Sequence, residues 1–293
     1  MDRLDRLAER FERVARALPE SVLQGEAGLS PEPSGVGFEA EILGELTHRE
    51  SERLLGYYSQ AGLEAAFEAY GIYDVLRARG YTDFTVELDL EAFAHKLRLR
   101  ADGLPVAECV LRRARGAADP CFAEWQRRFL PDLLVVEWLT LGDPRAEFSA
   151  SRPRLPGQTH PGSGIGAEIF VMLSLCARRL GLHGVLDVPQ RFHNAVFYRR
   201  RTPFFDPEYE GHFLALLDLL DRHSLPELAW AMEEGRVLEG PDGPPVRWLP
   251  REQVLPLDGR LASYFDGPAW RRACARARRS FQPVLRPRAA SSP

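Results

Sequence analysis

The chain has 293 residues, of which 45% are hydrophobic and 27% are charged, and its formal net charge is −4 at pH 7. This composition excludes an intrinsically disordered protein and suits one large globular domain with additions, or two modest domains. The longest apolar runs, such as LLVVEWLTL, are much shorter than the roughly 20 residues of a membrane helix. The N-terminus, MDRLDRLAERFERV, lacks the pattern of a secretory signal. We therefore expect a cytoplasmic protein that makes no membrane contact.

The cysteines and histidines show no pattern of a metal site or a disulfide framework. Cys109, Cys121, Cys176 and Cys274 share no C-x-x-C spacing, and no pair of the seven histidines has the spacing of metal ligands on a helix. Scattered cysteines in a chain of this length are typical of reduced, buried thiols. We predict no metal cofactor.

The charges are unevenly distributed along the chain. The last 24 residues carry seven arginines and no acidic residue, so the remainder of the chain is acidic. Such a segment could contact nucleic acid, which would give binding a steep dependence on salt. A solvated, partly disordered tail over 271–293 is the more common explanation, and we expect that instead.

The N-terminal part of the sequence predicts helices. In LDRLAERFERVARAL (4–18) apolar residues recur every three or four positions, which indicates a helix with one buried stripe. The following segment, GEAGLSPEPSGVG, has the composition of a linker. One or two further helices are expected over 51–80, beginning after Ser51 and ending at Gly80. Residues 1–80 are thus predicted to be a helical region.

From Asp83 onward the period changes to that of strands. FTVEL (84–88) and the run over 95–113 alternate apolar and polar residues, and the ADG within that run predicts a hairpin turn. After a candidate helix, PCFAEWQRRFL, the continuous apolar run DLLVVEWLTL predicts a buried central strand. A glycine turn, HPGSGIG (160–166), a helix over about 167–180 and a short strand, GVLDVP, then form a crossover unit that pairs its two strands in parallel.

The C-terminal part predicts two amphipathic helices, DPEYEGHFLALLDLLDRH and LPELAWAMEEGRV, with Asp206 and Pro207 at the start of the first. PPVRWLPREQVLPL is expected to be a strand or an extended segment. We interpret 207–270 as an appended helical cap or oligomerisation element.

The glycine turn could hold a phosphate group. A helix that begins at Gly166 leaves its first N–H groups without intrahelical partners, and its dipole attracts anions. Glycines at such a turn let the backbone approach phosphate oxygens closely. The segment lacks the lysine of a nucleotide-triphosphate loop, and the preceding antiparallel strands argue against a dinucleotide-binding domain.

These residues resemble the GNAT family of acyl-CoA N-acyltransferases. The family signature, Q/R-x-x-G-x-G/A, lies between a strand and a helix, as does PGSGIGA (161–167) here, with Gly164 and Gly166 in the glycine positions. Further on, HNAVFYRRRTPFF is similar to the family segment N-x-x-A-x-x-F-Y-x-x-x-G-F. The resemblance implies a GNAT-like core over 81–206, an α+β fold whose mostly antiparallel sheet contains a parallel, splayed strand pair, with flanking helices and helical terminal additions.

By this resemblance the protein would take acetyl-CoA or another acyl-CoA as cosubstrate, and an amine would attack the thioester directly. Tyr198 would donate a proton to the leaving thiolate, and Glu137 would act as the base. The residues implied in cofactor binding are Leu139, Thr140, Gly162, Ser163, Gly164, Ile165, Gly166, Ala167 and Asn194. Each catalytic candidate has a structural alternative: Tyr198 could be an ordinary half-buried aromatic residue, and Glu137 could pair with an arginine.

The sequence also departs from the family pattern. Pro161 replaces the Gln or Arg of the signature and provides neither a side-chain donor nor an N–H group. About 20 additional residues separate the predicted central strand from the turn. These departures leave open a second function class, a GNAT-fold binding or regulatory protein that acts through protein partners without catalysis.

Overall fold

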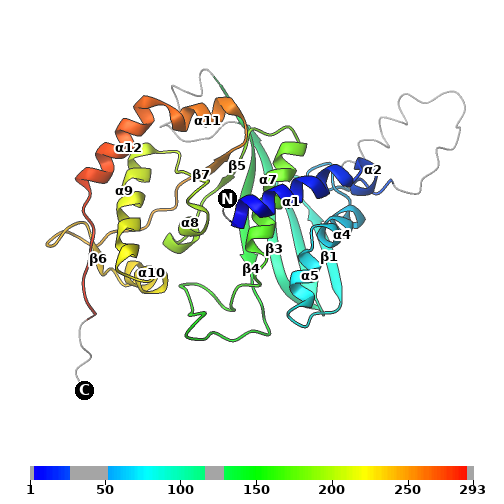
Figure 1. The fold of residues 1–293 in the computed structure, drawn as a ribbon, viewed down its shortest axis with the longest axis horizontal. Helices are drawn as coiled ribbons and strands as arrows, with labels where there is room; N and C mark the ends of the chain where they lie inside the picture. The colour runs from blue at the N-terminus through cyan, green and yellow to red at the C-terminus, as the bar shows by residue number, and fades with distance from the viewer. Residues whose placement is uncertain (1–2, 27–51, 116–128, 289–293) are drawn as a thin grey trace, which may run out of the picture. The chain divides into compact units, whose positions relative to one another are not determined.

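The computed structural model describes residues 3–26, 52–115 and 129–288, and these fall into two compact units. The first unit comprises Met1–Ala114, Leu134–Ala146 and Pro161–Gly181, and the second comprises Arg115–Leu133, Glu147–His160 and Leu182–Pro293. Figure 1 labels their elements. Most of the predicted linker, Ser51 and nearly all of the predicted helix PCFAEWQRRFL lie outside the described residues. The four-part domain division expected from the sequence stays a prediction.

The strands form a mixed sheet in the order β1-β2-β3-β4-β5-β7. Their bounds are β1 Phe84–Leu90, β2 His95–Ala101, β3 Leu104–Arg115, β4 Asp132–Leu141, β5 Gly184–Asp187 and β7 Gln253–Pro256. Pairs β1–β2, β2–β3 and β5–β7 are antiparallel. The backbone N–H of His183 donates to the Asp132 carbonyl at 2.8 Å, so the parallel pair β4–β5 begins here, within the second unit. The structure confirms a mostly antiparallel sheet with one parallel pair.

The hairpin turn between β2 and β3 has the predicted chemistry. Asp102 and Gly103 have φ angles of 50° and 77°, so both central residues are left-handed, as in the turn that matches the twist of two paired strands. The Asp102 carboxylate also accepts the backbone N–H groups of Thr82 and Asp83 at 3.0 and 2.7 Å. The turn is thereby fixed to the start of β1.

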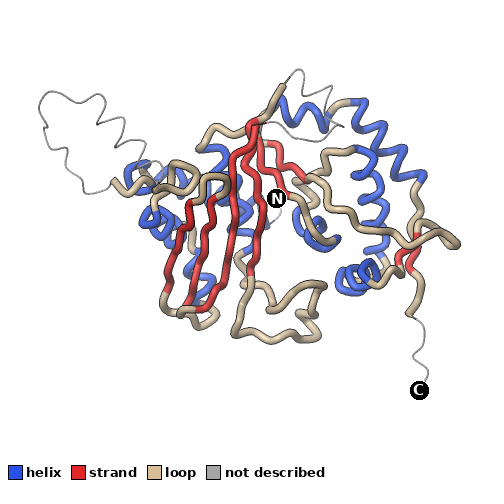
Figure 2. The backbone as a smooth tube through the Cα atoms, turned by 180° about the vertical axis from the view of Figure 1, so that it is seen from behind, coloured by secondary structure: helices blue, strands red, loops and turns tan. Residues whose placement is uncertain are grey.

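Helices cover one face of the strands in the first unit. Figures 1 and 2, which view the molecule from opposite sides, show the helices in front of β1–β4 in one and behind them in the other. Leu97 and Leu99 of β2 are buried, whereas Arg98 between them points to the other face and pairs with Glu108 at 2.7 Å. The helices of this unit are α1 Arg3–Ala17, α2 Glu20–Leu23, α4 Gln60–Ala69, α5 Ile72–Arg77 and α7 Gly166–Arg179.

The helix predictions for this unit are confirmed, with one difference at a start point. The region 51–80 forms two helices, and the first begins after Ser59, whose hydroxyl accepts the Gly62 N–H at 3.0 Å. Gly80, with φ of 85°, follows the end of the second helix, as predicted. No helix in the described parts of the chain combines the length and apolarity needed to cross a membrane.

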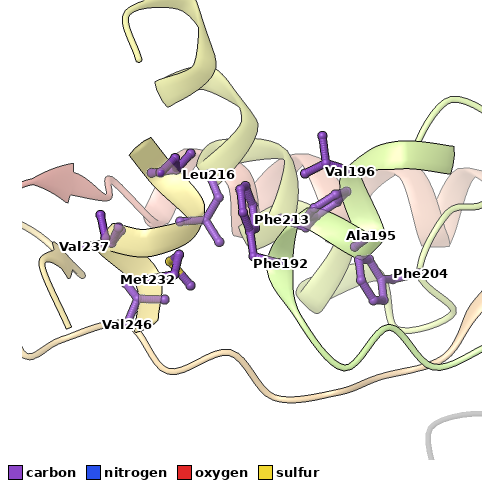
Figure 3. Packing of buried hydrophobic residues seen from close by; sticks show 11 residues of the cluster. Phe192, Ala195, Val196, Phe204, Phe213, Leu216, Met232, Val237 and Val246 are labelled. Atoms are coloured by element: carbon purple, nitrogen blue, oxygen red, sulfur yellow. The ribbon is translucent and has the colours of Figure 1, made fainter. Parts of the chain in front are cut away.

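The second unit has its own core, which Figure 3 shows in close-up. Phe192, Phe204, Phe213 and Leu216 pack together, and at most 4% of each residue is exposed. The predicted helices are confirmed, and the Asp206 side chain caps the start of α9. The remaining elements are α8 Phe192–Tyr198, α9 Pro207–Asp218, a 3-10 turn Leu219–Asp221, α10 Leu225–Glu233, β6 Val237–Leu238, α11 Gly259–Asp266, α12 Pro268–Ser280 and β8 Val284–Leu285.

Part of the arginine-rich segment is a packed helix. Helix α12 lies against α9, and Arg278 pairs with Asp218 at 2.6 Å while Arg276 pairs with Glu208 at 3.0 Å. These two arginines are therefore neutralised within the second unit, which leaves fewer cations of α12 for a nucleic acid.

Candidate functional site

The glycine turn follows β4 despite the long insertion between them. The Asp143 backbone N–H donates to the Pro161 carbonyl at 2.7 Å, so the chain leaves β4 and returns to the same place. Residues 147–160 of the insertion belong to the second unit, where the Trp230 indole donates to the Arg154 carbonyl at 2.9 Å. The two ends of the insertion therefore lie side by side, and the order of strand, glycine turn and helix is preserved.

Helix α7 begins without a side-chain cap. Its N-cap residue is Ile165, which is fully buried and whose side chain cannot accept a backbone N–H. Helices α4, α9, α10 and α11 have side-chain caps from Ser59, Asp206, Ser224 and Asp258, whereas α2, α5, α8 and α12 begin without one, as α7 does. An apolar side chain at this position gives the N–H groups of the helix end no acceptor of its own, so the N-cap residue does not offset the partial positive charge there.

Arg79 lies directly on the turn. Gly164 has a φ of 79°, and a Cβ atom built on it would lie 2.2 Å from Nη2 of Arg79 and 2.9 Å from its Cζ. Only glycine therefore allows both this backbone conformation and this approach of the guanidinium. Gly164 is exposed, so a ligand can reach the place where a cation, bare backbone and a helix N-terminus meet.

Asp143 holds the arginine in this position. Its carboxylate accepts hydrogen bonds from the Tyr81 hydroxyl at 2.7 Å, from Arg79 Nη1 at 3.1 Å and from the Arg145 backbone at 3.2 Å. Burial raises the pKa of Asp143, but these three donors outweigh it and hold the pKa below its ordinary value. The ionised carboxylate therefore binds Nη1 of Arg79, while Nη2 of the same guanidinium lies against Gly164.

Two buried polar atoms near the turn have unused hydrogen-bonding capacity. Ser163 is fully buried, and its hydroxyl has no partner among the described residues. The same holds for Oε2 of Glu168 in the first turn of α7, whose Oε1 lies 4.0 Å from Arg3. An unpaired buried hydroxyl costs about 1–3 kcal/mol. Ser163 is thus a buried hydroxyl whose hydrogen-bonding capacity the described residues leave unused, whereas Glu168 faces α1.

The predicted residues of β4 lie in its exposed second half. The strand is buried from Leu133 to Val135, but Glu137, Trp138 and Thr140 are exposed, and Leu139 is half-buried. The expectation of a wholly buried strand is therefore wrong beyond Val135. Strand β5 has four residues and starts beside Asp132, so β4 continues past the parallel pairing.

Glu137 has a structural partner. Its carboxylate accepts a hydrogen bond from the Arg112 guanidinium on β3, which is the structural alternative that the sequence left open. The ion pair therefore engages the carboxylate of the proposed base.

Asn194 and Tyr198 lie on α8 in the second unit. Asn194 is exposed, and Tyr198 is the half-buried last residue of the helix. Glu137, Leu139, Thr140 and the turn residues 162–167 thus belong to the first unit, whereas the two α8 residues belong to the other unit. The second unit also contains Asp187 at the end of β5, where burial raises the pKa of the carboxyl to about 7.

Sequence reasoning missed Arg79, Tyr81 and Asp143. The signal for Asp143 was its position directly after the central strand, where polar residues often serve a site. Arg79 and Tyr81 flank the helix-ending Gly80, and nothing local ties them to a turn so far along the chain. Among residues 3–26, 52–115 and 129–288 no group of three or more metal-ligating side chains occurs.

The sequence matches no protein-family model and no curated protein.

Proposed function

We propose that the protein binds an acyl-coenzyme A at the α7 turn and transfers the acyl group to an amine. The observation that carries this proposal is the guanidinium of Arg79 resting on the bare backbone of Gly164, at a helix N-terminus without a side-chain cap. A cation and oriented N–H groups at one exposed point favour a phosphate or pyrophosphate.

Arg79 accounts for the main departure of the turn from the GNAT pattern. The family signature places Gln or Arg where this chain has Pro161, and proline provides no donor. Arg79 comes from a distant segment and supplies a cation at the same turn, held by Asp143 at 3.1 Å. A pyrophosphate here would contact Gly164, Arg79 and the start of α7.

The chemistry needs a proton acceptor and a proton donor. The amine nitrogen forms a bond to the thioester carbonyl carbon, the carbon–sulfur bond breaks, the amine loses a proton and the thiolate gains one. Tyr198 is the proposed donor to the thiolate. Glu137 is the proposed acceptor, and its carboxylate is paired with Arg112.

Release of free thiol from acetyl-CoA, measured over a panel of amines, tests the catalytic half of the proposal. Turnover with any amine supports it. Tyr198→Phe should then slow transfer by about 10- to 100-fold while leaving cofactor affinity unchanged. Unchanged turnover would remove Tyr198 from the mechanism, and a parallel loss of affinity would indicate a structural role.

The second candidate function is a binding or regulatory protein without catalysis. The observations that favour it are the Glu137–Arg112 pair, which occupies the proposed base, and the insertion, whose 147–160 part is held by Trp230 in the second unit. Coenzyme A binding without turnover of any amine would support this alternative. Binding and turnover assays on the same preparation therefore separate the two.

A further inference from the structure

The first unit contains a cavity of about 380 Å³ beneath its helices. Its walls come from α1, α4 and α7 on one side and from β2 and β3 on the other. This volume lies within the range of about 300–1,000 Å³ that is usual for small-molecule sites. It is separate from the glycine turn, because residues 161–167 and Arg79 do not line it.

The walls of the cavity are apolar. Leu63 and Phe67 of α4 face it, as do Leu97 and Leu111 of the strands and Ile169 of α7. All five are nearly inaccessible from outside, with at most 8% of their surface exposed. Burying hydrocarbon against such walls is favourable in proportion to the area removed from water.

The charged residues that line the cavity are all arginines. Arg16 lies in the last turn of α1, Arg178 and Arg179 lie in the last turn of α7, and no acidic side chain lines the space. Arg16 and Arg178 are exposed, so they mark the opening, whereas Arg179 is half-buried and donates through Nη2 to the Ala15 carbonyl at 2.9 Å. Basic residues at helix C-termini stabilise the helix dipole, but that role does not require three of them to converge on one apolar space.

Polar side chains also line the cavity. Tyr58 and Tyr70 line the space, and the Tyr58 hydroxyl lies beside the Cys176 thiol. Cys176 and Arg179 are three positions apart on α7 and so lie on the same side of the helix, and Arg179 lines the same cavity as both tyrosines. A cation with neighbouring hydroxyl donors at one end of an apolar space is suited to a carboxylate head group attached to a hydrocarbon chain.

We infer that this cavity binds a single-chain fatty carboxylate. The hydrocarbon lies along the walls formed by α4, α7 and the strands, and the carboxylate meets Arg179 and the tyrosine hydroxyls. The inference does not depend on coenzyme A binding, because the two sites share no lining residue.

Calorimetry with dodecanoate below its micelle concentration tests this inference, with dodecylammonium as the control of opposite charge. We expect dodecanoate to bind at micromolar concentration and dodecylammonium at least tenfold more weakly. Arg179→Gln should weaken dodecanoate binding at least tenfold. Arg77→Gln is the matched control, because Arg77 pairs with Glu68 at 2.7 Å on the surface and does not line the cavity.

A second measurement uses the unaltered chain, so it does not depend on the folding of a variant. Cys109 and Cys176 line the cavity, whereas Cys274 lies in the second unit. Saturating dodecanoate should slow the alkylation of Cys109 and Cys176 by N-ethylmaleimide at least tenfold, resolved by peptide mass spectrometry, and leave Cys274 unaffected. Absence of binding up to the solubility limit, equal affinity for both head-group charges, or equal protection of all three thiols would overturn the inference.

Discussion

Replacement of Asp143 by asparagine should destabilise the first unit measurably. The carboxylate is 5% exposed and accepts three hydrogen bonds, at 2.7 Å from Tyr81, 3.1 Å from Arg79 and 3.2 Å from the Arg145 backbone. A hydrogen bond to a charged group contributes about 1.5–3 kcal/mol. The amide keeps one acceptor oxygen, and the Arg79 side chain is 28% exposed, so solvent screens part of the lost ion pair. We therefore expect a loss of about 2 kcal/mol in the free energy of unfolding.

Urea denaturation at pH 7, followed by tryptophan fluorescence and circular dichroism, measures this difference. Asp74→Asn is the matched control: Asp74 pairs with Arg77 at 3.0 Å, but its side chain is 70% exposed, so its loss should cost under about 0.5 kcal/mol. Because the folded pKa of Asp143 is held below its unfolded value, its contribution is present above the unfolded pKa of 3.8 and disappears as the pH falls through the folded pKa. Equal stability of Asp143→Asn and wild type at pH 7 would refute the role of this carboxylate.

Two further predictions concern the second unit. Gly211→Ala should destabilise this unit by more than about 2 kcal/mol, because the new Cβ would lie 2.4 Å from the Cys274 carbonyl oxygen. Gly240→Ala is the control, because a Cβ there meets nothing within 4 Å and should be tolerated. Equal melting temperatures of the two variants would contradict this packing. Burial raises the pKa of Glu210 to about 7, so the folded state binds more protons than the unfolded state and stability from this group falls as the pH rises from about 4.5 to 7. Glu210→Gln keeps an acceptor for the Phe204 N–H, so its free energy of unfolding should gain up to roughly 3 kcal/mol relative to wild type between pH 5 and pH 8. A difference in unfolding free energy that does not change with pH would show that Glu210 is ionised when folded.

Local patterns predicted the elements that build the site. The glycine spacing and the apolar period placed the turn and α7, and the ADG triplet placed the hairpin, because each of these features depends on residues adjacent in the chain. Arg79 could not be predicted, since its position on Gly164 arises from tertiary packing and from a carboxylate on a third segment. The buried-strand prediction for β4 failed beyond Val135 because a run of apolar residues does not show where a neighbouring strand ends.

The N-cap of α4 is a second feature that local sequence patterns did not predict. Ser59 and Ser51 are equally good caps by residue type, and the sequence alone favoured the earlier one. The Ser59 hydroxyl also donates to the Leu23 carbonyl at 3.3 Å, a contact with α2 that local propensity does not contain.

Calorimetric titration of the purified protein with acetyl-CoA tests the central claim most directly, when wild type is compared with Gly164→Ala and Gly181→Ala. Both glycines have positive φ, at 79° and 68°, so alanine imposes a similar backbone cost of about 1–2 kcal/mol at either end of α7. Only the Cβ at Gly164 displaces Arg79, since nothing lies within 4 Å of a Cβ at Gly181. We predict micromolar binding by wild type and Gly181→Ala, and at least tenfold weaker binding by Gly164→Ala. No binding by wild type at millimolar acetyl-CoA, or equal affinity of all three proteins, would contradict the proposed site.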